Sequence, residues 1–376
     1  MRLLLTTDTI GGVWDYSVTL AHALEQDGRA LLLAVVGRPS DDQLGDLPEE
    51  IAIECRAHGL EWMRDGQRDL AATAGWLARL ARGWNADVVH LNQMSYTGLQ
   101  PFPAPTIVAV HSDVCSWFGE VHGTPAPAEW RPYVEAVRSG LRAATTVLTP
   151  SRYQADLVGR HFGRAPDVVI HNGCRPATSP HSAREGEPFL LSVGRAWDEA
   201  KGMAVYDEAV HLLGDRAPAA HLLGALQAPG GTRFEPTALS CHGRLSRTEV
   251  ARWMDRASIY VGPSLYEPFG LAPLEAALHG CALVLSDIGS FRELWDGCAE
   301  FFSPGDARGL ASAIEGLAGD PDRLSSLANG ARERALTRYA DRIFAERYLA
   351  LYRRVATDGA VGETPAPARA VAGGAR

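Results

Sequence analysis

Short apolar runs alternate with longer amphipathic segments along most of the chain. The first half opens with the apolar run "RLLLTT" (2–7), continues with a segment of helical periodicity over 13–28, and returns to an apolar run, "ALLLAVVG" (30–37). The same texture predicts further strands at 51–57, 87–92, 106–112 and 145–151, and a helix over 68–84. Strands that are apolar throughout and alternate with helices predict a parallel sheet with both faces covered.

The alternation starts again after a polar, loop-like segment at 182–188. Strands are expected at 189–195, 220–226, 239–243, 258–264, 282–287 and 298–304, with helices between them. From 305 to about 357 the chain is predicted to be helical. Residues 358–376 are rich in Ala, Gly and Pro and lack large apolar side chains, so this tail is predicted to be disordered. The pattern predicts two doubly wound α/β halves.

Length and composition limit the class of protein. A chain of 376 residues is too long for one compact core, which favours two domains. The net charge of −9 argues against a general attraction to nucleic acid or to anionic lipid. Six widely spaced cysteines without a paired motif predict reduced thiols in a cytoplasmic protein and no metal cluster. We find neither a signal-peptide pattern nor an apolar stretch long enough to span a membrane.

Polar residues gather where the predicted strands end. Open parallel sheets bind ligands at this edge, so these positions are the first candidates for a site. In the first half they are Thr6–Asp8, Gly11–Gly12, Asn92 and His111–Asp113, and in the second half Arg195, His242–Arg244, Ser264–Glu267 and Asp287–Ser290. We therefore predict a ligand between two facing domains.

Two carboxylates interrupt the otherwise uncharged segment "LYEPFGLAPLEAALHG" (265–280). Pro273 suits the first turn of a helix, which puts Glu267 in the preceding loop and Glu275 near the helix start. Backbone N–H groups at such a start can bind phosphate, and the two acids could accept hydrogen bonds from hydroxyl groups on either side of it. Alternatively, Glu275 only complements the helix dipole.

Cationic and imidazole candidates also have two interpretations. Arg195 and Lys201 could bind a diphosphate, or they could be two solvated surface charges. His111 could contact a ligand or be a hydrogen-bonded core residue. Asp113 and Glu120 are interpreted as solvated loop acids.

The segment "EPFGLAPLEA" resembles the E-x7-E motif of retaining GT-B glycosyltransferases of glycosyltransferase family 4. The resemblance runs from "TTDTIGGV" through "VVHLN", "AVHSD", "VIHNG", "SVGRAWDEAKG" and "SDIGSFREL" to the C-terminal helix. It implies two Rossmann-like domains facing across a cleft, with an acceptor domain over 1–175 and a nucleotide-sugar donor domain over 186–340. A helix over 341–357 would cross back onto the first domain.

The resemblance also implies residue roles. Arg195 and Lys201 would hold the donor diphosphate, and Glu275 would bind the ribose hydroxyls. Glu267 and His111 would contact the transferred sugar. The remaining donor-side positions are Gly12, which would line the cleft, Gly270, Leu271 and Ala272 near phosphate and sugar, and Gly243, Arg244 and Leu245 near the base. The acceptor-side candidates are Trp14, Asp15, Tyr16, Asn92, Asp113 and Trp117.

Five residues in three segments depart from the family pattern. Cys174-Arg175 follows "NG", where the family usually has Val or Ile and then Asp, and Asn92 stands where many members have a second histidine. "GRAWDEAKG" carries two extra acids, Asp198 and Glu199, which we interpret as facing water.

The expected activity is transfer of a hexosyl unit from a nucleotide diphosphate sugar, most commonly a UDP-sugar in this family, to a hydroxyl of a soluble small-molecule or saccharide acceptor. The anomeric configuration would be retained, and no metal or other cofactor is expected. A lipid- or polysaccharide-assembling transferase at the membrane surface stays open but is not favoured; its basic amphipathic helix would be 68–84, with Arg68, Arg79 and Arg82. A nucleotide-sugar epimerase or a phosphorylase on the same architecture, or a catalytically silent nucleotide-sugar-binding protein, are further alternatives.

Overall fold

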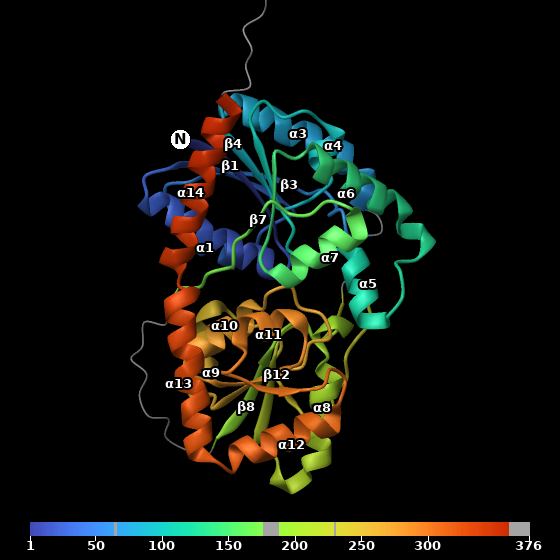
Figure 1. The fold of residues 1–376 in the computed structure, drawn as a ribbon, viewed down its shortest axis with the longest axis vertical. Coiled ribbons are helices and arrows are strands. Elements are labelled where there is room, and N and C mark those ends of the chain that lie inside the picture. The colour runs from blue at the N-terminus through green and yellow to red at the C-terminus, as the bar shows by residue number, and fades with distance from the viewer. Residues whose placement is uncertain (64–65, 176–187, 229–230, 361–376) are drawn as a thin grey trace, which may run out of the picture.

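The structure is a computed structural model that describes residues 1–63, 66–175, 188–228 and 231–360. Two α/β domains lie one above the other along the long axis of the molecule (Figure 1). Most of the polar segment 182–188 lies outside the described residues, as do residues 361–376 of the tail predicted to be disordered. Residues 358–360 belong to the last helix instead of the tail.

The N-terminal domain is built on a seven-stranded, entirely parallel sheet in the order β3-β2-β1-β4-β5-β6-β7. Its strands are β1 (Arg2–Asp8), β2 (Ala30–Val36), β3 (Ala52–Arg56), β4 (Val88–Leu91), β5 (Thr106–Ala109), β6 (Thr146–Thr149) and β7 (Val168–Val169). Its helices are α1 (Gly12–Gln26), α2 (Asp41–Gly45), α3 (Leu70–Gly83), α4 (Tyr96–Leu99), α5 (Val114–His122), α6 (Arg131–Ala143) and α7 (Arg152–Phe162). Two hydrophobic clusters, one on each face, explain why the inner strands are apolar throughout, whereas the edge strand β3 is mostly exposed.

The C-terminal domain has a six-stranded parallel sheet in the order β10-β9-β8-β11-β12-β13. Its strands are β8 (Phe189–Val193), β9 (Ala219–Leu223), β10 (Ser240–Cys241), β11 (Ile259–Gly262), β12 (Ala282–Ser286) and β13 (Glu300–Phe302). Its helices are α8 (Met203–Leu213), α9 (Arg247–Arg256), α10 (Leu271–Leu278), α11 (Gly289–Trp295), α12 (Ala307–Ala318) and α13 (Pro321–Arg338), with the short 3₁₀ turn η3 (Glu199–Lys201) after β8. The prediction of two doubly wound α/β domains is confirmed.

Strand order fixes where each sheet can bind a ligand. The order reverses between β1 and β4 in the first sheet and between β8 and β11 in the second. The loops leaving those strands diverge there, and ligands bind in the space between them. We therefore expect a ligand at the loops that follow β1, β4, β8 and β11.

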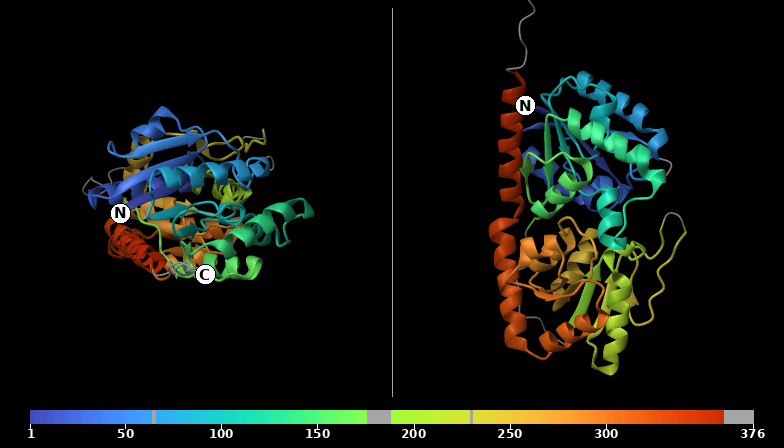
Figure 2. Two further views of the ribbon diagram at one scale, coloured as in Figure 1. Left: turned by 90° about the horizontal axis from the view of Figure 1, so that it is seen from above. Right: turned by 45° about the vertical axis from the view of Figure 1, so that its right-hand side comes forward.

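The last helix, α14 (Asp341–Ala360), returns to the N-terminal domain. Helices α13 and α14 run along one side of both domains (Figure 2, right). The apolar side chains of α14 join the core that lies between α1 and the first sheet, namely Phe344, Tyr348, Leu349, Leu351, Tyr352 and Val355. Helix α1 is consequently covered by the sheet on one side and by α14 on another.

Helix α3, the basic amphipathic candidate for a membrane surface, packs its apolar side inward. Trp76, Leu77 and Ala81 are buried in the core against the first sheet. Packing on a sheet therefore accounts for the amphipathic pattern of this segment. No helix within the described part of the chain is long and apolar enough to cross a bilayer.

Candidate functional site

The two domains touch at the start of α1 and at the loops that follow β8 and β11. A Cβ built on Gly11 would lie 2.5 Å from Nη1 of Arg195, and one built on Gly12 would lie 3.4 Å from a terminal methyl of Leu271. Gly11 also has φ of 75°, which side chains other than glycine rarely adopt. The glycine pair thus permits a close approach of the N-terminal domain to Arg195.

Arg195, Lys201 and Glu267 come together in the C-terminal domain. Nη2 of Arg195 donates a 2.7 Å hydrogen bond to Asp198, and Nζ of Lys201 donates a 2.5 Å bond to Oε2 of Glu267. Burial alone would raise the pKa of Asp198, but the charges of Arg195 and Lys201 outweigh it and hold that pKa below its usual value. The result is two cations, each paired with a carboxylate, at the edge where a phosphate would be expected.

Glu275 lies to one side of this group, near Asp15 and Arg247. Burial and the neighbouring Asp15 carboxylate raise the pKa of Glu275 to about 7, although Arg247 opposes the shift. Nη1 of Arg247 lies 3.9 Å from Asp15, which belongs to the other domain. These three side chains therefore form a second, mixed-charge group that also bridges the domains.

The remaining donor-side positions surround these two groups. Gly270 begins α10 with φ of 91°, and Leu271 and Ala272 form the first turn of that helix, half-buried. The loop Gly243–Leu245 follows the edge strand β10. Burial raises the pKa of Asp15, and the charge of Arg244 in this loop is among those that oppose the shift. The loop is thus on the side of Glu275 and Asp15.

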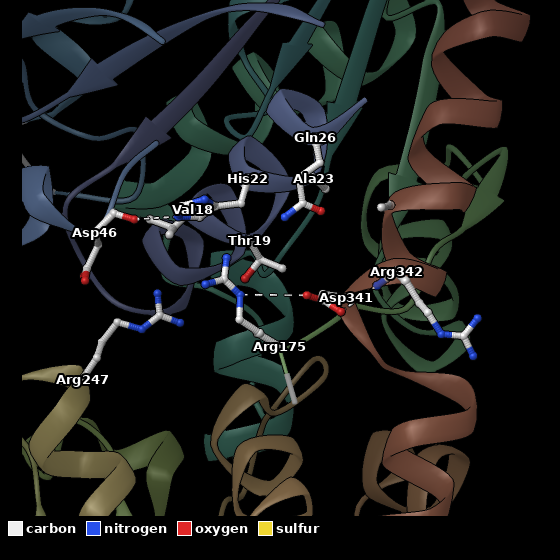
Figure 3. Close-up of a pocket in the computed structure, with 11 residues that line it drawn as sticks. Val18, Thr19, His22, Ala23, Gln26, Asp46, Arg175, Arg247, Asp341 and Arg342 are labelled. Carbon is white, nitrogen blue, oxygen red and sulfur yellow. Dashed lines mark hydrogen bonds and ion pairs between the residues drawn. The ribbon is translucent and has the colours of Figure 1, made fainter. Parts of the chain in front are cut away.

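A pocket of about 310 Å³ opens beside this second group (Figure 3). It is bounded by α1 through Thr19 and His22, by Arg247 at the start of α9, and by Asp341 at the start of α14. Arg175 lines it too, with Nε 4.0 Å from a carboxylate oxygen of Asp341. The departure at Arg175 from the family pattern thus places a cation in this interdomain pocket.

His111 is held by Asn92 in the N-terminal domain. The side-chain amide of Asn92 donates to the Thr6 carbonyl (2.6 Å), so its oxygen faces Nε2 of His111 at 3.0 Å. Nε2 of His111 must then carry the hydrogen, which leaves Nδ1 as the acceptor. Burial lowers the pKa of His111 to about 4, so the ring is neutral near pH 7.

The acceptor-side set is not assembled as the sequence suggested. The Tyr16 hydroxyl is fully buried and donates to Tyr348 of α14 (2.7 Å). Trp14 is buried in the same core. Of the six candidates, Asp15 and Trp117 are the two that keep appreciable exposure. The interpretation of Trp14 and Tyr16 as ligand contacts is therefore wrong, because α14 covers this face of α1.

Asp113 is likewise not a solvated acid. It is 4% exposed and caps α5, accepting hydrogen bonds from the Ser116 N–H (2.8 Å) and from the side chain of Gln154 (3.0 Å). The side-chain amide of Asn92 is hydrogen-bonded to Thr6 and His111. Neither side chain is free for an acceptor.

A further set of contacts between the domains has no recognisable pattern in the sequence. Ser151 donates to the Pro268 carbonyl (2.6 Å), and Tyr266 donates to Gln154 (2.9 Å), so the residues on both sides of Glu267 are held by α7. The Glu293 carboxylate of α11 accepts from the backbone N–H groups of Arg152 and Tyr153 at the start of α7, each at 3.0 Å. Ser151 can be recognised from the sequence as a helix cap, but its partner in the other domain cannot.

Metal-ligating side chains do not gather in the part of the chain that the structure describes. Among those residues, no group of three or more His, Cys, Asp or Glu side chains could hold an ion. The six cysteines are all free thiols, and four of them are buried.

Comparisons with known proteins agree with this geometry. Residues 10–177 match the model of glycosyltransferase family 4, and residues 187–320 match that of glycosyl transferases group 1. The alpha-maltose-1-phosphate synthase of Mycolicibacterium smegmatis is 34% identical over 318 residues, covering 72% of this chain and 79% of that protein. The glycogen synthase of Mycobacterium tuberculosis is 32% identical over 278 residues, covering 67% of this chain, which spans only 65% of that protein's length.

A solved structure supports the architecture. HepE of Anabaena in complex with UDP-glucose superimposes with a TM-score of 0.73 at 17% identity, covering 94% of this chain and 100% of that one. At this level of identity the likeness concerns the fold. Together with the two facing parallel sheets and the family matches, it shows that the chain belongs to glycosyltransferase family 4 and has the GT-B architecture.

Proposed function

We propose that this glycosyltransferase moves a hexosyl unit from a nucleotide diphosphate sugar, with UDP-sugar as the first choice, to a hydroxyl of a soluble small-molecule or saccharide acceptor. The observation that carries the proposal is the position of Arg195 and Lys201 at the reversal point of the second sheet, where the charges of both act on Asp198 and Arg195 lies against Gly11 of the other domain. Two adjacent cations suit a diphosphate, above all when its charge increases as it leaves. The UDP-glucose complex of HepE supports the choice of donor.

The geometry favours a reaction in which positioning and charge do most of the work. The bond between the anomeric carbon and the β-phosphate oxygen breaks while the acceptor oxygen bonds to the same carbon. The acceptor proton passes to the leaving phosphate oxygen, on the same face of the sugar, so the anomeric configuration is retained. Arg195 and Lys201 would stabilise the charge on that phosphate, each by an amount on the order of 10²–10³ in rate.

The acids and His111 would position the sugar and the nucleotide. Glu267 lies 2.5 Å from Lys201 and would accept hydrogen bonds from sugar hydroxyls next to the phosphate. Nδ1 of His111 would accept a hydrogen bond from a sugar hydroxyl, since Nε2 is already bonded to Asn92. Glu275 would accept hydrogen bonds from the ribose hydroxyls. The base would lie near Gly243, Arg244 and Leu245. We further propose that no metal is required, because the cation pair supplies the positive charge.

The choice of a soluble acceptor rests on α3. Its apolar face, the feature that would insert into a membrane surface, is buried in the core of the N-terminal domain. The net charge of −9 also opposes binding to anionic lipid.

The test begins with a thermal-shift panel of nucleotide sugars, because a ligand that binds only the folded state raises the melting temperature. The strongest donor is then screened against soluble acceptors, and product analysis without any acceptor separates a transferase from an epimerase.

Arg195→Ala and Lys201→Ala should each lower kcat about 10²–10³-fold while the melting temperature changes little. Arg216→Ala is the matched control, since Arg216 is 62% exposed and pairs with Glu315 of α12. Wild-type turnover in both site variants would rule the proposal out.

A further inference from the structure

The two extra acids of "GRAWDEAKG" connect the domains. Asp198 is 8% exposed, and its two oxygens have different partners. Oδ2 accepts from Nη2 of Arg195 (2.7 Å). Oδ1 accepts from the Ala200 N–H of η3 (3.2 Å) and from Nε1 of Trp117 on α5 of the other domain (3.3 Å). The prediction that Asp198 faces water is therefore wrong.

Helix α5 reaches from the N-terminal domain to the turn that carries these acids (Figure 1). Beyond Trp117, the same helix places His122 Nε2 3.6 Å from Glu199, but this second pair is 38% and 67% exposed. Exposed pairs of this kind contribute little. Two contacts therefore join α5 to η3, one buried and directed at Arg195 and one at the surface.

Asp198 engages only part of the Arg195 guanidinium. Nη2 is bound to Asp198, while Nη1 points at Gly11, where the chain has no side chain. The guanidinium also lies 5.5 Å from the centre of the Trp197 ring. Asp198 thus fixes the orientation of the group and leaves Nη1 beside Gly11 of the other domain.

We propose that Asp198 is a positioning residue, which aims Arg195 at the donor diphosphate, and that Trp117 makes this aim depend on contact between the domains. The inference rests on the proposed function, because it assigns the target of Arg195. The physical reason is that an arginine side chain has many rotamers, and fixing one of them before the ligand arrives lowers the entropy cost of binding. Trp117 donates to the other oxygen of the same carboxylate, which the Ala200 N–H also holds, so withdrawal of α5 would remove the one of these two donors that belongs to the other domain.

A competing role for Asp198 predicts the opposite change in nucleotide affinity. If Asp198 only neutralises Arg195, it competes with the diphosphate for the guanidinium. Removing its charge would then free Arg195 and strengthen binding. The direction of the change in affinity therefore separates positioning from competition.

The experiment measures binding of UDP, ADP and GDP to the full chain by calorimetry, and turnover with the best donor. Asp198→Asn should weaken binding of the preferred nucleotide on the order of tenfold and lower kcat as well. Trp117→Phe keeps an aromatic ring but loses the N–H donor, and it should weaken binding in the same direction by a smaller factor. His122→Gln on the same helix is the matched control and should behave as wild type.

A double-mutant cycle excludes a general structural effect. In an Arg195→Ala background, Asp198→Asn should have no further effect on nucleotide affinity, because Asp198 acts through Arg195. Additive losses, or binding by Asp198→Asn as tight as wild type or tighter, would overturn the inference while the proposed function stands. If Asp198→Asn does not fold, a Trp117→Phe variant that is indistinguishable from His122→Gln also overturns it. A wild-type protein that binds none of the three nucleotides would overturn both proposals.

Discussion

Gly11→Ala is the sharpest perturbation of the contact between the domains. The backbone at Gly11 has φ of 75° and ψ of −152°, a combination that is strained for any residue with a Cβ. The cost of such strain is on the order of 1–3 kcal/mol. In addition, the new Cβ would lie 2.5 Å from Nη1 of Arg195.

The clash determines the expected effect on activity. Carbon and nitrogen atoms that are not bonded approach to about 3.5 Å, so the guanidinium must move by about 1 Å, or the domains must separate by as much. A misplacement of about 1 Å in a catalytic group can lower the rate about 10²-fold. Gly11→Ala should therefore lose about two orders of magnitude in kcat/KM and most of its affinity for nucleotide.

Gly28→Ala separates the clash from backbone strain. Gly28 has φ of 66°, but a Cβ built on it would meet no atom within 4 Å. This variant should lose about 1 kcal/mol of stability and keep wild-type turnover. The assay is kcat/KM with the best donor, together with the melting temperature of each variant. Equal turnover in the two alanine variants would mean that Gly11 and Arg195 are not in contact in the working enzyme.

Two further predictions concern the second group and the last helix. Because the pKa of Glu275 is raised to about 7, its carboxyl is protonated below that pH. Nucleotide affinity should therefore rise a few-fold between about pH 6 and 8, as the carboxylate becomes able to accept hydrogen bonds from both ribose hydroxyls. Calorimetry should show a weaker pH dependence of affinity in Glu275→Gln, and the same pH dependence as in the wild type would contradict this role. Tyr348→Phe removes the 2.7 Å hydrogen-bond partner of the buried Tyr16 hydroxyl. The free energy of unfolding should fall by about 1–2 kcal/mol, with unchanged turnover. An unaltered melting temperature would show that this hydrogen bond does not stabilise the fold.

The sequence predicted the fold well because the strands are local and distinctive. Short apolar runs such as 30–37, which lie between glycine-containing turns, favour buried strands, and their alternation with helices favours two parallel sheets. The donor-side residues could be predicted for a related reason: Arg195, Lys201 and Glu267 follow strands on either side of one reversal point, so strand order alone brings them together.

The acceptor side could not be predicted in this way. Whether Tyr16 is free depends on α14, which begins more than 300 residues later and packs against α1. Asp198 looked like a surface acid because its partner Trp117 belongs to the other domain. Such contacts depend on how the two domains meet, and neither periodicity nor spacing encodes that.

The most direct test of the donor site is a crystal structure of the protein with its preferred nucleotide diphosphate bound. We expect the nucleotide between the two domains, with its β-phosphate within hydrogen-bonding distance of Arg195 and Lys201 and its ribose hydroxyls bound to Glu275. A nucleotide bound elsewhere, with the Arg195–Asp198 and Lys201–Glu267 pairs intact and no phosphate near them, would contradict it.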